Sequence, residues 1–138
     1  PIRRSLQAGL VPLVHGDVAL DTVRGGTITS TETIFTFLTT NLPVSRIILL
    51  GKEDGVYDQQ GAVIPEITPD NFIALRSALG GSDGTDVTGG MLTKVQDSLQ
   101  LATNPPYPIV QIANGLRADL LRNALLGEEV DGTTITRG

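Results

Sequence analysis

The sequence contains no cysteine and only one histidine, His15. These two shortages exclude a disulfide framework, a zinc ribbon, thiol catalysis and a metal site built from several histidines. No apolar run approaches the roughly 18 residues that a membrane-spanning helix needs, and the first residues show no signal-peptide pattern. We therefore expect a soluble, cytoplasmic protein with no membrane partner.

Basic residues are also few. The 138 residues include 10 Lys and Arg against 15 Asp and Glu, which gives a net charge of −5. A nucleic-acid binder would present a basic stripe, so we expect no nucleic-acid partner. Hydrophobic residues make up 40% and charged residues 18%, a balance that favours a buried core over disorder. The length suits one domain, and without a visible linker or repeat we expect residues 1–138 to form a single unit.

Short apolar segments alternate with segments whose apolar residues recur at helical spacing. The pattern predicts helices after Ser30, from Pro69, after the glycine-rich residues 80–90, and near Leu120. Strands are predicted at residues 9–15, 18–20, 46–50 and 109–112, with an edge strand at 133–136. Continuously apolar strands that alternate with helices are typical of a parallel sheet covered on both faces. The sequence therefore predicts an α/β fold, a three-layer αβα sandwich with a mainly parallel sheet.

In such sheets ligands bind beyond the carboxyl ends of the strands, so the loops that follow these ends are candidate sites. The most informative loop is residues 80–90, which holds five of the 16 glycines and leads directly into a helix. A helix N-terminus attracts anions, and Gly89 and Gly90 would let a phosphate approach the backbone. Lys94 falls in or just after the first turn, where the helix dipole disfavours a cation by a few tenths of a kcal/mol unless an anion is bound. A flexible loop followed by a solvated lysine explains the same residues equally well.

Three further candidates have ordinary structural explanations beside the functional ones. His15-Gly16-Asp17 lies at a predicted strand end, where Asp17 could bind a ligand or simply satisfy backbone N–H groups in a turn. Asp54 begins an Asp-Gly pair, which most often only forms a turn. Glu32 stands at a helix start, where its charge complements the dipole. His15 could act as a general base, but no partner acid or nucleophile accompanies it in the sequence.

Four segments together resemble the amino acid kinase superfamily. They are Gly-Leu-Val-Pro-Leu-Val-His-Gly-Asp-Val at 9–18, Asp-Gly-Val-Tyr-Asp at 54–58, Ile-Pro-Glu-Ile at 64–67 and Asp-Val-Thr-Gly-Gly-Met-Leu-Thr-Lys at 86–94. In order and spacing they are most similar to the C-terminal half of isopentenyl phosphate kinases, and the resemblance covers residues 9–135. The last of the four segments is the most specific.

The resemblance implies transfer of the γ-phosphoryl group of ATP to isopentenyl phosphate, a small-molecule phosphate substrate, with Mg²⁺. It assigns the substrate phosphate to Gly16, with Asp17 beside it, and catalysis to Lys94. Nucleotide binding would fall to Glu32, Asp54, Gly89, Gly90 and Lys94, and no residue is assigned to a metal. Two positions depart from the family pattern: Glu32 replaces an aspartate, and Gly-Lys-Glu at 51–53 replaces a Thr-Asp-Val type of segment.

Two motifs that the resemblance leads us to look for are absent from residues 1–138. The family's N-terminal half carries a Lys-x-Gly-Gly loop and a histidine that contacts the acceptor phosphate, and His15 is not that histidine. We therefore expect the chain to be the nucleotide-binding half of a kinase that is a homodimer when complete and inactive as this fragment. Two alternatives remain open. One is another kinase of the superfamily, acting on fosfomycin, glutamate or carbamate, and the other is a non-catalytic nucleotide-binding or assembly module.

Overall fold

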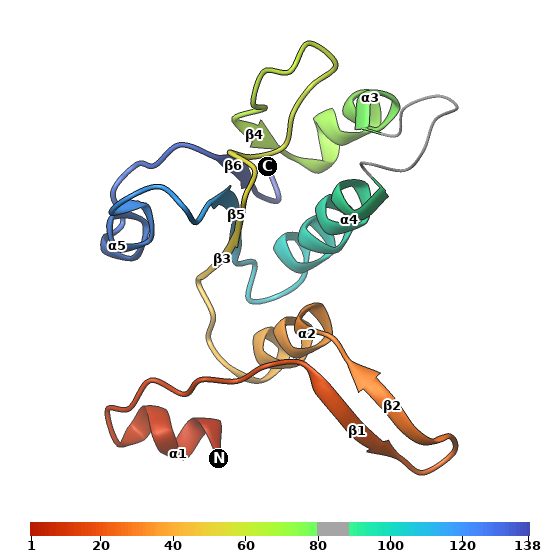
Figure 1. The fold of residues 1–138 in the computed structure, drawn as a ribbon, viewed down its shortest axis with the longest axis vertical. Coiled ribbons are helices and arrows are strands. Elements are labelled where there is room, and N and C mark those ends of the chain that lie inside the picture. The colour runs from red at the N-terminus through yellow and green to blue at the C-terminus, as the bar shows by residue number, and fades with distance from the viewer. Residues whose placement is uncertain (80–88) are drawn as a thin grey trace. The chain divides into compact units, whose positions relative to one another are not determined.

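The computed structural model describes residues 1–79 and 89–138, with the side chains at positions 32, 77–79 and 89 left out of the description (Figure 1). The chain divides into two compact units, Pro1–Leu38 and Thr39–Gly138, and each is described by itself. That residues 1–138 fold as a single unit stays a prediction.

The first unit contains a short helix and a β-hairpin, and a second helix begins there. Helix α1 (Ile2–Gln7) is followed by β1 (Asp17–Asp21) and β2 (Gly25–Thr29), which pair antiparallel. Helix α2 (Thr31–Asn41) begins after Ser30, whose Oγ accepts a hydrogen bond from the backbone N–H of Thr33 at 3.2 Å. This bond satisfies one of the donors left free at a helix start, so the predicted N-cap is confirmed.

The predicted strand at residues 9–15 is wrong for this structure. These residues form no ladder, and the side chains of Val11 and Leu13 are 94% and 97% exposed. A strand exists only when a neighbour pairs with it, and none of the described strands lies beside this segment. The apolar composition of residues 9–15 favours burial, but no described segment covers the side chains of Val11 and Leu13.

The second unit is built on a four-stranded sheet in the order β3-β5-β6-β4. Its strands are β3 (Arg46–Gly51), β4 (Glu66–Ile67), β5 (Ile109–Asn114) and β6 (Thr133–Ile135). The β3–β5 and β4–β6 pairs are parallel, and the β5–β6 pair is antiparallel, so the sheet is mixed. The predicted edge position of residues 133–136 is wrong, because β6 lies between β5 and β4 with Thr133 and Ile135 fully buried.

Helices cover both faces of this sheet, which confirms the predicted α/β class. Helices α3 (Pro69–Leu79) and α4 (Gly89–Thr103) lie on one side of the sheet, and α5 (Leu120–Leu126) lies on the other (Figure 1). The core is formed by apolar side chains of α4 and the sheet, among them Val95, Leu99, Ala102, Val110, Ile112 and Ile135. Helix α4 ends two residues before the Pro105-Pro106 pair, since proline cannot continue a helix. Among the described helices, none combines the length and apolar character needed to cross a membrane.

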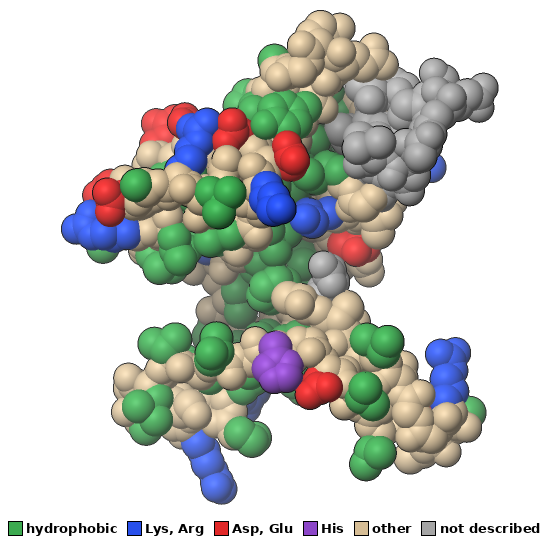
Figure 2. All heavy atoms as spheres, in the orientation of Figure 1, with side chains coloured by type: hydrophobic (Ala, Val, Ile, Leu, Met, Phe, Trp, Pro, Cys, Tyr) green, Lys and Arg blue, Asp and Glu red, His purple; other side chains and the backbone are tan. Residues whose placement is uncertain are grey.

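Many large hydrophobic side chains remain on the surface, and several of them belong to the first unit (Figure 2). The hairpin exposes Val18, Leu20 and Ile28 at 72%, 95% and 81%, in addition to Val11 and Leu13 before it. Soluble monomers rarely expose apolar surface of this extent, since it associates with other apolar surface.

We expect residues 1–138, expressed alone, to self-associate through this surface. Light scattering coupled to size exclusion should show a mass that rises with protein concentration. Replacing Val11 and Leu13 with serine should lower the association, because both side chains are almost fully exposed. A clean monomer at every concentration would contradict the prediction.

Candidate functional site

Two parallel strands of the second unit end side by side. In the β3–β5 register Gly51 lies opposite Asn114, so the loops that follow both strands start from the same edge of the sheet. The first of these loops contains the Asp-Gly-Val-Tyr segment, and the second begins with Asn114-Gly115. This edge is the position at which open α/β sheets bind ligands, as the sequence predicted for the loop after Leu50.

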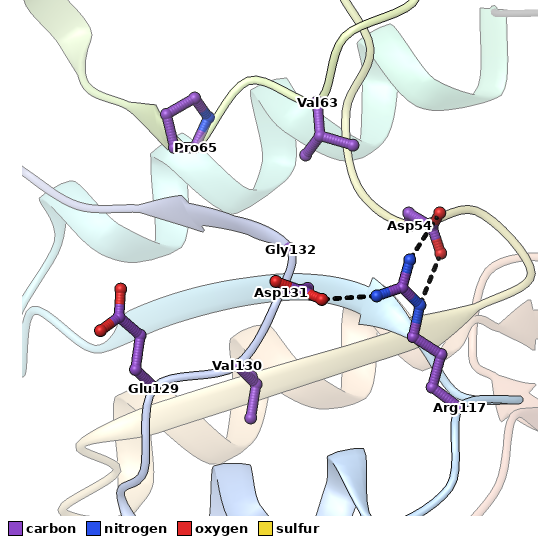
Figure 3. Close-up of a pocket in the computed structure, with 8 residues that line it drawn as sticks. All are labelled: Asp54, Val63, Pro65, Arg117, Glu129, Val130, Asp131 and Gly132. Carbon is purple, nitrogen blue, oxygen red and sulfur yellow. Dashed lines mark hydrogen bonds and ion pairs between the residues drawn. The ribbon is translucent and has the colours of Figure 1, made fainter.

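Asp54 joins the two loops through its carboxylate. The Asn114 side-chain amide donates a hydrogen bond to Oδ1 at 2.8 Å, and Arg117 Nε donates to the same oxygen at 3.0 Å. Arg117 Nη2 lies 2.9 Å from Oδ2, so the guanidinium holds both carboxylate oxygens (Figure 3). The hydrogen bonds from Asn114 and then Arg117 hold the pKa of Asp54 below its usual value of 3.8.

Arg117 also reaches a third segment of the chain. Its remaining terminal nitrogen, Nη1, donates to Asp131 Oδ2 at 2.5 Å, just before β6 begins (Figure 3). The Arg117 guanidinium therefore uses all three nitrogens on two carboxylates. The hydrogen bond to Asp54 and the charge of that carboxylate, followed by the contact with Asp131, raise the pKa of Arg117 above its usual value. A guanidinium fork fits this bidentate geometry, which a lysine cannot reproduce.

The loop behind Asp54 is fixed by a buried hydroxyl. Thr133 Oγ1 accepts a hydrogen bond from the backbone N–H of Val56 at 2.8 Å and donates one to the carbonyl of Ile64 at 2.7 Å. A Cβ at Gly55 would lie 2.7 Å from both Thr133 Oγ1 and a methyl carbon of Val63, and one at Gly132 would lie 2.5 Å from the Ile112 carbonyl. Both glycines are therefore required by close approach of neighbouring segments.

A cavity of about 330 Å³ opens beside this junction (Figure 3). The residues that line it are Asp54, Val63, Pro65, Arg117, Glu129, Val130, Asp131 and Gly132. Three carboxylates and one guanidinium give it an excess of negative charge at neutral pH. This charge repels a triphosphate, so the cavity does not suit the phosphates of a nucleotide.

The sequence interpretation identified Asp54 but missed its partners Asn114 and Arg117, and it missed Asp131, the second carboxylate that Arg117 binds. Asn114-Gly115 marked only the end of a strand, and Gly132 stood before a segment interpreted as an edge strand. Arg117 is 63 residues from Asp54 in the chain, and no local pattern links positions so far apart.

Two of the predicted site residues lie in the first unit and make local contacts. A Cβ at Gly16 would lie 2.7 Å from the carbonyl oxygen of Thr29, so glycine is required there by packing. Asp17 Oδ1 accepts a hydrogen bond from the backbone N–H of Val18 at 2.7 Å, as in the ordinary turn interpretation. His15 Nδ1 lies 2.9 Å from the carbonyl oxygen of Gly16.

The remaining predicted residues belong to the start of α4 or are only partly described. Helix α4 begins at Gly89, so Lys94 lies in its second turn, where the side chain is half-buried and makes no ion pair with another described residue. A Cβ at Gly90 would meet no described atom within 4 Å, so packing does not require glycine there. Residues 80–88 of the predicted glycine loop and the side chain of Glu32 lie outside the described residues.

Comparison with known proteins identifies the family. Residues 1–123 match the model of the amino acid kinase family. The chain belongs to this family. It is similar to isopentenyl phosphate kinase of Haloferax volcanii, with 46% identity over 96 residues, which cover 70% of this chain and 38% of the relative.

Two further relatives extend the similarity along nearly the whole chain. Isopentenyl phosphate kinase of Methanothermobacter thermautotrophicus is 36% identical over 140 residues, which cover 98% of this chain and 52% of the relative. A solved structure of isopentenyl phosphate kinase matches with a TM-score of 0.72 and 31% identity, over 98% of this chain and 49% of that one. The chain spans about half the length, or less, of the relatives it matches.

The Asp54 contacts predict an observable titration. The lowered pKa means that the contacts stabilise the fold when Asp54 is ionised, above the unfolded pKa near 3.9, and that this contribution is lost as the pH falls through the folded value. Carboxyl-carbon NMR of the complete protein should give a midpoint for Asp54 below 3.8. Asn114→Ala and Arg117→Ala should each raise it, since each removes a donor to the charged form. A wild-type midpoint at or above 3.8 would contradict the geometry.

Proposed function

We propose that the complete protein containing this chain transfers the γ-phosphoryl group of ATP to isopentenyl phosphate and forms isopentenyl diphosphate. The observation that carries the proposal is the similarity of nearly the whole chain to isopentenyl phosphate kinases, at 36% identity over 98% of its length for one of them. This activity would place the protein in isoprenoid biosynthesis in the cytoplasm, and we propose a homodimer for the complete protein.

The start of α4 is the proposed phosphate site. This helix has 15 residues, so its first N–H groups and its dipole offer partial positive charge to an anion. Glycine favours a helix less than alanine does, and no packing contact within the described chain explains Gly90. A phosphate that approaches the backbone at Gly89 and Gly90 would explain both glycines, with Glu32 as a further proposed nucleotide contact.

Lys94 is the proposed catalytic residue. Phosphoryl transfer requires alignment of the reacting groups and positive charge near the phosphoryl oxygens, and it needs no covalent nucleophile. Lys94 lies one turn beyond the helix start and makes no ion pair with the other described residues, which supports this role. We propose that it holds the transferred phosphoryl group, while Gly16 and Asp17 contact the acceptor phosphate.

Magnesium enters this proposal as part of the Mg·ATP substrate. Among residues 1–79 and 89–138, no three histidine or acidic side chains form a group that could hold a metal. The Asp54 carboxylate already accepts hydrogen bonds from Asn114 and Arg117. The described residues therefore do not fit a resident Mg²⁺ site, whereas Mg²⁺ bound to substrate phosphates needs few protein ligands.

Lys94→Ala tests the proposed phosphate contact. If Lys94 binds a phosphate, its removal should weaken ATP binding by about 1.5–3 kcal/mol, or roughly ten- to hundredfold, because a charge-assisted hydrogen bond is lost. AMP, which lacks the outer phosphates, should be affected far less. Calorimetry of the complete protein with both nucleotides measures the difference. Arg122→Ala removes an exposed cation from α5 and is the matched control, for which we expect no change. Equal ATP affinity in wild type and Lys94→Ala would leave the start of α4 without a phosphate role.

The activity itself is tested by incubating the complete protein with ATP and each candidate acceptor. We expect ATP-dependent formation of isopentenyl diphosphate, with isopentenyl phosphate preferred over glutamate, carbamate and fosfomycin. Residues 1–138 alone should form none, because the proposed acceptor contacts of the other half would be missing. Preference for a different acceptor would reject the proposed substrate, and turnover by residues 1–138 alone would reject the proposed division of the active site.

A further inference from the structure

We propose that Arg117 and Asp54 are positioning residues that hold the loop of residues 51–58 in place for the nucleotide. The inference rests on the proposed function, since it assumes that this loop borders a nucleotide site. It assigns Arg117 a role that local sequence patterns do not indicate, and it makes Asp54 an anchor of the loop and not a direct ligand.

The contacts of Arg117 and the charge of the cavity beside it disfavour a role as a phosphate ligand. Each of its three nitrogens already faces a carboxylate oxygen, with Nε and Nη2 on Asp54 and Nη1 on Asp131. The excess negative charge of the cavity beside them disfavours a phosphate at the remaining N–H groups of Arg117. Arg117 is thus committed within the protein, although its side chain is 42% exposed.

The same contacts show what Arg117 can do. The guanidinium connects the loop after β3, the turn after β5 and the segment before β6, which are distant in the sequence. On the other side of Asp54, the loop is tied to β6 through Val56 and the buried Thr133 hydroxyl. The carboxylate contacts and the hydroxyl contact together fix the loop at both ends of the Asp54-Gly55-Val56 segment. Without Arg117, Asn114 alone among the described residues would hold the side chain of Asp54.

The test compares variants of the complete protein in two independent measurements. Hydrogen exchange reports on the loop itself, and calorimetry with Mg·ADP reports on nucleotide binding without requiring turnover. In Arg117→Ala and in Asp54→Asn, we expect faster amide exchange in residues 51–58 and about tenfold weaker Mg·ADP binding. Affinity for isopentenyl phosphate should remain unchanged. Arg117→Lys should restore little, because an ammonium group cannot hold both oxygens of Asp54.

The double variant Asp54→Asn/Arg117→Ala tests whether Asp54 and Arg117 act through one ion pair or independently of each other. If both residues act through the same ion pair, the double variant should bind Mg·ADP within about twofold of the weaker single variant. Arg122→Ala is the matched arginine control, and neither measurement should change in it. Thermal unfolding distinguishes displacement of the loop from loss of the fold. We expect each variant to melt at a temperature similar to that of the wild type.

Several results would overturn the proposal. Unchanged exchange in residues 51–58 of Arg117→Ala would show that the ion pair does not hold the loop. Faster exchange with normal Mg·ADP affinity would show that the loop does not serve the nucleotide, and equal losses for nucleotide and isopentenyl phosphate would indicate a general structural role. A wild-type protein that binds Mg·ADP but does not phosphorylate isopentenyl phosphate would reject the proposed function alone. A wild-type protein that binds no nucleotide would reject both.

Discussion

The ion pair between Asp54 and Arg117 is the contact on which the arrangement of the second unit's loops depends. It connects the loop after β3 with the turn after β5, and Arg117 extends the connection to Asp131 before β6. Exposed ion pairs usually contribute little to stability, but this one is bidentate and shares its carboxylate with Asn114. The same loop is also held by the buried hydroxyl of Thr133 through Val56. We therefore expect this ion pair to matter more for the position of the loop after β3 than for the stability of the fold.

Charge separates this junction from the proposed phosphate site. Beside the junction, carboxylates outnumber the single guanidinium, so the cavity there is unfavourable for a triphosphate. The start of α4 has the opposite character, with the positive end of the helix dipole, a glycine that no described neighbour requires, and Lys94 one turn further on. A nucleotide held as we propose would have its phosphates at the start of α4, and its base or ribose would contact the loop of residues 51–58.

Patterns of neighbouring residues predicted helix starts and the buried strands of the sheet correctly. Helix α2 follows Ser30 and α3 begins at Pro69, as the residue types indicated. The buried strands at 46–50 and 109–112 were recognised as β3 and β5 from their apolar runs. The family resemblance rested on motifs spread along the whole chain, and the comparison confirmed the family.

The parts that the sequence did not predict depend on pairing between distant segments. Residues 9–15 have the composition of a buried strand, yet no strand in the described part of the chain pairs with them. Residues 133–136 were predicted to form an edge strand, but β6 lies between β5 and β4, and Thr133 is buried there with hydrogen bonds to Val56 and Ile64. Arg117 was not recognised because nothing beside it in the sequence points to Asp54. The predicted roles of Gly16, Asp17, Glu32, Asp54, Gly89, Gly90 and Lys94 stay predictions.

The most direct measurement is a crystal structure of the complete protein with a non-hydrolysable ATP analogue and Mg²⁺. The account predicts that the terminal phosphate lies against the backbone N–H groups at Gly89 and Gly90 within reach of the Lys94 ammonium group. It also predicts that Arg117 still holds both oxygens of Asp54. Phosphates bound to Arg117, with the Asp54 contact broken and Lys94 turned to solvent, would contradict it.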